Sequence, residues 1–170
     1  MLYFKTIVFP ESLTKDQVEK ALRKYALKRT MTLDFKSATI NIGIDQLFLG
    51  LDRKMDLQFT RIKTSFELLL PKMIIKLSKH PDTSNYKIRL SALPLAVATV
   101  LCLALAANLI AIAKGQFSID SMVSIAIPTL VFIGLVFFEL KLVTRTVNKA
   151  MTLYLKDSVA TTAIKHHNKP

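Results

Sequence analysis

The sequence predicts an α+β domain with one helix and a mainly antiparallel sheet, followed by a two-helix transmembrane hairpin and a C-terminal amphipathic helix. Three observations support this prediction: apolar and polar residues alternate through much of 1–89, two charge-free runs dominate 90–140, and a helical period continues after 140. We therefore divide the chain into a cytoplasmic α+β domain at 1–89, a hairpin at 90–140, and a basic amphipathic helix with a frayed tail at 141–170.

The first domain contains one clear helix signal. Thr14 and Gln17 have the spacing of a capping box and predict a helix from Thr14 to about Lys28. A β-rich run precedes it, and period-two alternation follows it. The strands predicted in this way lie at 2–8, 31–36, 40–44, 47–51, 55–60, 73–77 and 86–89. Because the helix and most strands are segregated along the chain, the pattern favours α+β over α/β.

The hairpin is predicted from two apolar runs, at about 90–113 and 121–138, which contain no charged residue. The first run is about 36 Å long as a helix, enough to cross a hydrocarbon core of about 30 Å. The link at 114–120 is so short that the two helices must be antiparallel neighbours. Gly115 in this link is expected to end the first helix in a left-handed conformation.

Charge distribution predicts the orientation of this hairpin. Residues 1–89 carry 17 Lys and Arg against 9 Asp and Glu, residues 139–170 carry 6 against 2, and the link carries one of each sign. Positive residues flank membrane spans on the cytoplasmic side. We therefore expect two spans in the inner (plasma) membrane, with both termini in the cytoplasm and only the link outside.

Small and polar residues in the first span predict where the helices pack. Ala104, Ala107, Asn108 and Ala111 form a face that allows close approach, and an asparagine in such a face more often joins helices than conducts ions. No charged residue lies at mid-depth in either span, which disfavours a proton relay or a charged-substrate pathway.

Two charged residues bracket the hairpin at its cytoplasmic end. Arg89 and Glu139 should lie at similar depth on adjacent elements, where they either form an interfacial ion pair or each simply end a span.

The chain after the second span reads as a continued helix with a basic stripe. Lys141, Arg145, Lys149 and Lys156 share one sector of a helical wheel, opposite an apolar face. Three interpretations fit: the helix lies on anionic lipid headgroups, packs on the first domain, or mediates self-association. The basic residues are thus expected to contact headgroups or a partner.

No pattern in the chain indicates catalysis. It lacks phosphate-loop, dinucleotide, zinc-protease, nucleophile-elbow and CxxC motifs, and its only cysteine, Cys102, lies within an apolar run. We expect no enzymatic activity, no cofactor, no metal site and no small-molecule substrate. The net charge of +12 is explained by membrane-flanking lysines and arginines, and no nucleic-acid-binding motif accompanies it.

Elimination leaves two hypotheses about function. The first is an anchoring or scaffold subunit of a larger membrane-associated assembly, whose cytoplasmic domain binds protein subunits as a homo- or hetero-oligomer. The second is a membrane sensor or effector, in which a ligand or partner bound by the domain drives the hairpin to oligomerise into a pore or to perturb the bilayer.

Overall fold

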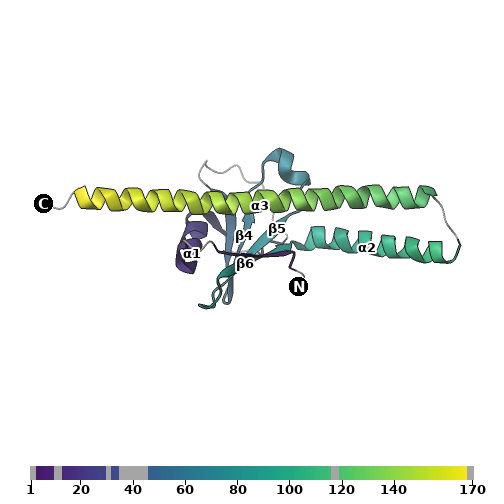
Figure 1. Ribbon diagram of the computed structural model, residues 1–170, viewed down its shortest axis with the longest axis horizontal. Coiled ribbons are helices and arrows are strands. Elements are labelled where there is room, and N and C mark those ends of the chain that lie inside the picture. The colour runs from purple at the N-terminus through teal and green to yellow at the C-terminus, as the bar shows by residue number, and fades with distance from the viewer. Residues whose placement is uncertain (1–2, 10–12, 30–31, 35–45, 116–118, 168–170) are drawn as a thin grey trace.

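The computed structural model describes residues 3–9, 13–29, 32–34, 46–115 and 119–167, and Figure 1 shows their arrangement around one sheet and two long helices. In chain order the elements are β1 (Lys5–Val8), α1 (Lys15–Lys24), β2 (Ala26–Arg29), β3 (Phe48–Asp52), β4 (Asp56–Arg61), the 3₁₀ helix η1 (Ser65–Leu69), β5 (Met73–Ser78), β6 (Asn85–Leu90), α2 (Ala92–Ala113) and α3 (Ile119–His167).

The strands form one six-stranded sheet in the order β1-β6-β5-β4-β3-β2. Neighbouring strands are antiparallel except β2 and β3, which are parallel, so the sheet is mixed. A parallel pair needs a long crossover between its strands, and β2 ends at Arg29 whereas β3 begins at Phe48. The predicted mainly antiparallel sheet with one small helix is thus confirmed, with a parallel edge that the alternation did not indicate.

Helix α1 begins as predicted and ends earlier. Thr14 and Gln17 form the capping box, with each side chain bonded to the backbone of the other residue. Tyr25 caps the last turn, and residues 26–29 pair with β3 as strand β2 instead of continuing the helix. The prediction of helix to about Lys28 is wrong because pairing with β3 outweighs the helical propensity of this segment.

The later strand predictions are accurate and one earlier prediction is not. Strands β3, β4, β5 and β6 coincide with the alternating segments at 47–51, 55–60, 73–77 and 86–89. Residues 32–34 are not a strand: Leu33 and Asp34 form a turn. The rest of the predicted strands at 31–36 and 40–44 lies outside the described residues, apart from Thr32.

Both faces of the sheet are covered. One face packs against α1 and α3, whose buried residues include Val18, Leu22, Val143 and Val147. The other face carries a smaller cluster formed by Leu33, Leu49, Leu51 and Ile74. Because strand side chains alternate between faces, the face on which a residue lies decides which element it meets.

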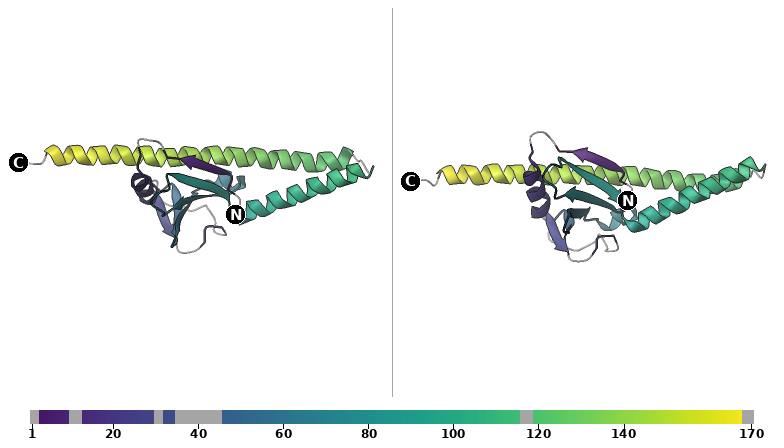
Figure 2. Two further views of the ribbon diagram at one scale, coloured as in Figure 1. Left: turned by 60° about the horizontal axis from the view of Figure 1, so that its bottom comes forward. Right: turned by 90° about the horizontal axis from the view of Figure 1, so that it is seen from below.

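The hairpin projects from one end of the sheet, and its second helix does not stop there. Figures 1 and 2 show α2 and α3 side by side beyond the sheet, and α3 continuing as one helix across the sheet and past α1. The expected C-terminal amphipathic helix is therefore the continuation of the second apolar helix. Gly115, at a φ of +74°, follows α2 in the left-handed conformation that was predicted.

Both α2 and α3 are long and apolar enough to cross a membrane. Their most apolar segments are 0% and 6% buried, respectively, so these segments are not core helices of this chain. Large apolar side chains are exposed along both, among them Leu93, Leu103, Leu109, Leu130 and Phe137.

Candidate functional site

Buried charged side chains, a pocket and an unsatisfied hydroxyl lie together at the root of the hairpin. We define this root as the junction between the sheet, the first turns of α2 and the part of α3 that faces them. Strand β6 ends at Leu90 and α2 begins at Ala92, so a single residue, Ser91, connects them. Its amide donates to the carbonyl of Lys72 at 2.9 Å, and its carbonyl accepts from the amide of Leu95 at 3.1 Å. The hairpin is thus joined to the sheet by one residue whose backbone is hydrogen-bonded on both sides, and no flexible linker separates them.

A buried ion cluster ties α3 to the sheet at this root. Glu139 is fully buried and accepts a hydrogen bond from Arg61 at 2.8 Å. Lys63 lies 3.7 Å from the other carboxylate oxygen and donates to the Leu70 carbonyl at 2.6 Å. Arg61 also bonds Glu67 of η1 at 2.8 Å. Because buried charges are stable only when paired, these contacts hold β4, η1 and α3 in one arrangement.

The pKa values of the cluster reflect burial and pairing. Burial acts to lower the pKa of Arg61, but the hydrogen bond and charge of Glu139 outweigh it and the pKa is raised. For Lys63 the balance is reversed: burial lowers its pKa, and Glu139 only partly compensates. Burial acts to raise the pKa of Glu67, yet the amide of Thr64 and the guanidinium of Arg61 bring it below its ordinary value.

Arg89 and Glu139, for which the sequence left an interfacial ion pair as one of two alternatives, are bonded to different partners. Both oxygens of Asp34 accept from Arg89 at 2.9 Å, and one of them also accepts from the amide of Ala92 at 3.1 Å. The reason is the alternation of β6: Ile88 and Leu90 belong to the core beneath α3, so Arg89 lies on the opposite face. Asp34 thereby caps the start of α2.

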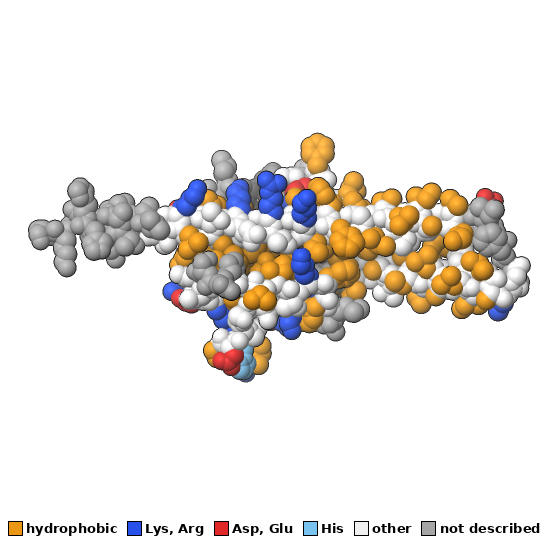
Figure 3. All heavy atoms as spheres, in the orientation of Figure 1, with side chains coloured by type: hydrophobic (Ala, Val, Ile, Leu, Met, Phe, Trp, Pro, Cys, Tyr) orange, Lys and Arg blue, Asp and Glu red, His pale blue; other side chains and the backbone are white. Residues whose placement is uncertain are grey.

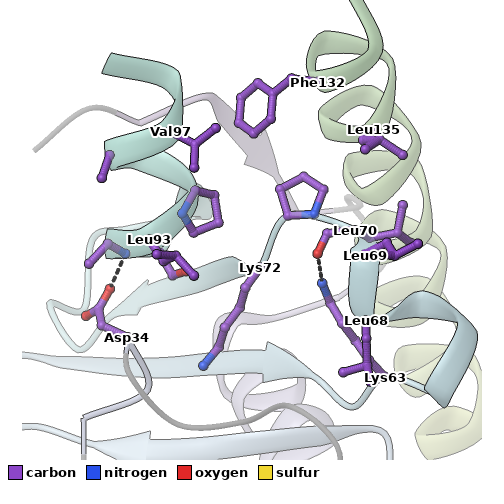
Figure 4. A pocket seen from close by; sticks show the side chains of 15 residues that line it. Asp34, Lys63, Leu68, Leu69, Leu70, Lys72, Leu93, Val97, Phe132 and Leu135 are labelled. Carbon is purple, nitrogen blue, oxygen red and sulfur yellow. Dashed lines mark hydrogen bonds between the residues drawn. The ribbon is translucent and has the colours of Figure 1, made fainter. Parts of the chain in front are cut away.

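A pocket of about 880 Å³ opens at the root between α2, α3 and the segment around η1. Figure 4 shows that its charged residues, Asp34, Lys63 and Lys72, lie at one end, and that Val97 and Phe132 lie at the other. The remaining lining residues are mainly apolar and include Leu68, Leu69, Leu70, Leu93 and Leu135.

Two polar groups of this pocket are held in an apolar setting. Burial lowers the pKa of Lys72 to about 8, against the opposing charge of Asp34. Its ammonium donates to the carbonyl of Leu33. Ser91 is 1% exposed, and its hydroxyl oxygen has no hydrogen-bond partner. A buried hydroxyl in this state costs free energy unless a ligand or water satisfies it.

The residues predicted to pack the hairpin lie mostly on its inner face. Asn108 donates to the carbonyl of Ala104 at 3.1 Å, and its side-chain oxygen accepts from Ser121 of α3 at 3.2 Å. Ala104 and Ala111 are half-buried with it, and Ala107 is exposed.

The basic stripe on α3, defined as Lys141, Arg145, Lys149 and Lys156, lies on the exposed side of the helix. The apolar side, with Val143, Val147 and Met151, is buried against the domain. Figure 3 shows Lys and Arg side chains in a row where α3 crosses the domain and hydrophobic side chains covering the hairpin. Of the three interpretations of this helix (lying on lipid headgroups, packing on the first domain, or self-association), the second accounts for its apolar face, which packs on the domain.

Sequence reasoning missed Asp34, Arg61, Lys63 and Lys72. A signal for two of them was present: Arg61 and Lys63 continue the alternation of Leu57 and Phe59, whose side chains belong to the core, and this indicates their face of the sheet though not their partner. Within the part of the chain that the structure describes, no group of three or more His, Cys, Asp or Glu side chains could hold a metal ion.

No protein-family model matches the sequence, and neither the curated proteins nor the solved structures give a match. The class of protein is therefore defined by its own architecture: a mixed sheet with a helix, followed by two long apolar helices.

Proposed function

We propose that this protein is a non-enzymatic integral membrane protein that anchors its α+β domain, as a scaffold for partner proteins, on the cytoplasmic face of the inner (plasma) membrane. The observation that carries the proposal is the continuity of α3. One helix presents exposed Leu130 and Val131 in the hairpin, and buried Val143 and Val147 in the core of the domain. A helix shared in this way would hold the domain at a fixed height and orientation above the bilayer.

The distribution of exposed apolar side chains supports a membrane boundary at the root of the hairpin. Helix α2 is about 33 Å long, which matches a hydrocarbon core of about 30 Å. Next to the root, η1 exposes Phe66 at 96% and Leu69 at 85%, which is costly in water and favourable in the headgroup region. The excess of Lys and Arg on both sides of the hairpin supports cytoplasmic termini.

The direction of α3 supports a partner protein as the occupant of the basic stripe. If the hairpin crosses the bilayer, α3 continues away from it, and Lys156 is about 22 Å further along the helix than Lys141. Screening limits lipid charge to a range of about 8–10 Å at physiological salt. Headgroups can therefore attract only the first part of the stripe, and an acidic protein surface fits its whole length.

Membrane insertion is tested with single-cysteine variants in a Cys102→Ala background. A cysteine at Lys114, in the link, should react with an impermeant maleimide only from outside intact cells, and one at Lys54 only after lysis. Extraction with alkaline carbonate should leave the chain in the membrane fraction. Release by carbonate, or labelling of both sites from the same side, would contradict the proposal.

The scaffold role is tested by in-cell crosslinking of the tagged chain. We expect defined crosslinked partners that are lost in Arg145→Glu/Lys149→Glu and kept in Lys54→Glu, which reverses an exposed charge away from α3. Equal crosslinking in both variants would argue against the basic stripe as the partner surface.

A second candidate, the sensor or effector, is favoured by the direct β6–Ser91–α2 connection, because movement of the sheet would move the hairpin. It predicts ion leakage from vesicles that contain the purified chain, dependent on an added partner. A tight bilayer with and without the partner would exclude it.

A further inference from the structure

We propose that the pocket at the root of the hairpin binds one anionic phospholipid, with its phosphate at Lys72, Lys63 and the hydroxyl of Ser91 and its acyl chains against the apolar end. This inference rests on the proposed membrane placement of the hairpin. It assigns a specific lipid site, whereas the anchoring function needs only a nonspecific bilayer.

The charged end of the pocket favours an anion. Two ammonium groups, Lys63 and Lys72, line it together with one carboxylate, Asp34. Both oxygens of Asp34 already accept from Arg89, so its charge is matched by a guanidinium outside the pocket lining. Glu139, the acid nearest Lys63, is likewise bonded by Arg61 at 2.8 Å. A phosphate at this end would accept further charge-assisted hydrogen bonds from the two ammonium groups, which already donate to the carbonyls of Leu70 and Leu33.

Ser91 gives an independent indication of a ligand. It lines the pocket, is 1% exposed, and its hydroxyl oxygen has no hydrogen-bond partner. The hydroxyl sits where α2 begins, but the cap on Ala92 is made by Asp34 instead. A phosphate oxygen beside Lys72 would accept from this hydroxyl and remove the cost of leaving it unsatisfied.

The apolar end selects a lipid rather than a free phosphate. Val97 and Phe132 face each other from α2 and α3, and the exposed Leu93 lines the pocket from the first turn of α2. A phosphate ion would leave this end empty, whereas an acyl chain would bury it. A volume of about 880 Å³ is in the range that accommodates a headgroup with the upper parts of its chains.

The more polar hollow beside β5 and β6 provides a contrast within the same molecule. It is lined by Lys54, Lys76, Lys79 and Lys87, but Lys76 pairs with Asp56 at 2.9 Å and Lys79 with Asp52 at 2.5 Å. Its lysine charge is thus partly neutralised, and it lies away from the hairpin. It has neither the buried hydroxyl nor the apolar wall of the root pocket.

The test uses the full chain in nanodiscs of phosphatidylcholine containing phosphatidylglycerol, released into mild detergent and weighed by native mass spectrometry. The wild type should retain one phosphatidylglycerol after phosphatidylcholine is stripped. Lys72→Gln/Ser91→Ala should weaken retention at least tenfold. Lys141→Gln removes an exposed lysine near the membrane boundary but outside the pocket, and should retain the lipid.

Further arms separate the alternatives. Val97→Trp fills the apolar end without changing any charge, and should also lose the lipid; thermal unfolding verifies that each variant is folded. No preference for phosphatidylglycerol, or equal loss in Lys141→Gln, would overturn the proposal. Displacement of the lipid by millimolar inorganic phosphate would also overturn it, in favour of a soluble anion.

The result is distinguishable from failure of the anchoring function. A chain that does not insert fails to enter nanodiscs and is released by carbonate before any lipid is measured. A chain that inserts but retains no phosphatidylglycerol contradicts only the lipid site.

Discussion

Arg61 on β4 and Glu139 on α3 are 78 residues apart in sequence and joined by a 2.8 Å hydrogen-bonded ion pair. The pair is buried, with Glu139 fully enclosed. It lies where α3 passes from the hairpin onto the sheet, so it sets the height at which the domain meets the apolar helices. Three structural segments, β4, η1 and α3, depend on it through Glu67 and Lys63.

Replacing Glu139 should therefore destabilise the whole chain. Glu139→Leu leaves Arg61 and Lys63 buried without their counter-charge, and the free energy of unfolding should fall by about 3–5 kcal/mol. Urea unfolding in mild detergent measures this change. Asp16→Asn, which removes the exposed Lys20–Asp16 pair, is the matched control and should leave the free energy unchanged within error. A similar small change in both variants would show that the buried cluster contributes little.

The Arg89–Asp34 pair should make stability depend on acid. The hydrogen bond from Arg89 lowers the pKa of Asp34 in the folded state, against the effect of burial. The stabilisation is therefore complete above the unfolded pKa of about 3.9 and is lost as the pH falls through the folded value. The difference in unfolding free energy between wild type and Asp34→Asn should be largest near neutral pH and shrink below about pH 4. A constant difference across this range would contradict the assignment.

The contact between Asn108 and Ser121 should couple the two hairpin helices. A double-mutant cycle with Asn108→Ala and Ser121→Ala isolates their hydrogen bond from the other interactions of each residue. We expect a coupling energy of about 0.6 kcal/mol, typical of interhelical hydrogen bonds in membranes. Coupling indistinguishable from zero would indicate that the hairpin packs without this bond.

Spin labels should locate the membrane boundary. In a Cys102→Ala background, a label at Phe66 should be more accessible to oxygen than to a water-soluble nickel complex, because η1 is expected to enter the headgroup region. A label at Met55, exposed in the β3–β4 turn at the end of β4 far from Arg61, should show the opposite order. Equal accessibility of both labels to the nickel complex would show that η1 lies outside the bilayer.

Lipid retention at the root pocket should weaken in alkali. Lys72, which shares the pocket with Asp34 and Lys63, has its pKa lowered by burial to about 8, so it loses its positive charge as the pH rises through that value. An anionic lipid stabilises the charged form and shifts this loss upward. Retained phosphatidylglycerol should therefore decrease between about pH 7 and pH 10 in the wild type, and not in Lys72→Arg. Identical dependence of lipid retention on pH in the wild type and in Lys72→Arg would show that Lys72 does not bind the lipid.

Local sequence patterns predicted most of the helices and strands, but few of the contacts between them. The capping box at Thr14, the left-handed Gly115 and the strands β3 to β6 depend on short-range periodicity and capping, and they lie where expected. Strand β2 was assigned to a helix because its strand pairing with β3 is absent from local sequence. The cluster around Glu139 was missed because its members come from β4, η1 and α3.

The sequence by itself determined the two apolar helices, their close antiparallel connection and the inward register of β4, since each follows from composition or from a period of two or 3.6 residues. Only the tertiary structure decided that Arg89 meets Asp34 and Glu139 meets Arg61. The physical reason is that β6 turns Arg89 to the face opposite α3, while β4 turns Arg61 toward it. Such partners depend on which faces of elements far apart in sequence come together, and no local sequence pattern encodes these contacts.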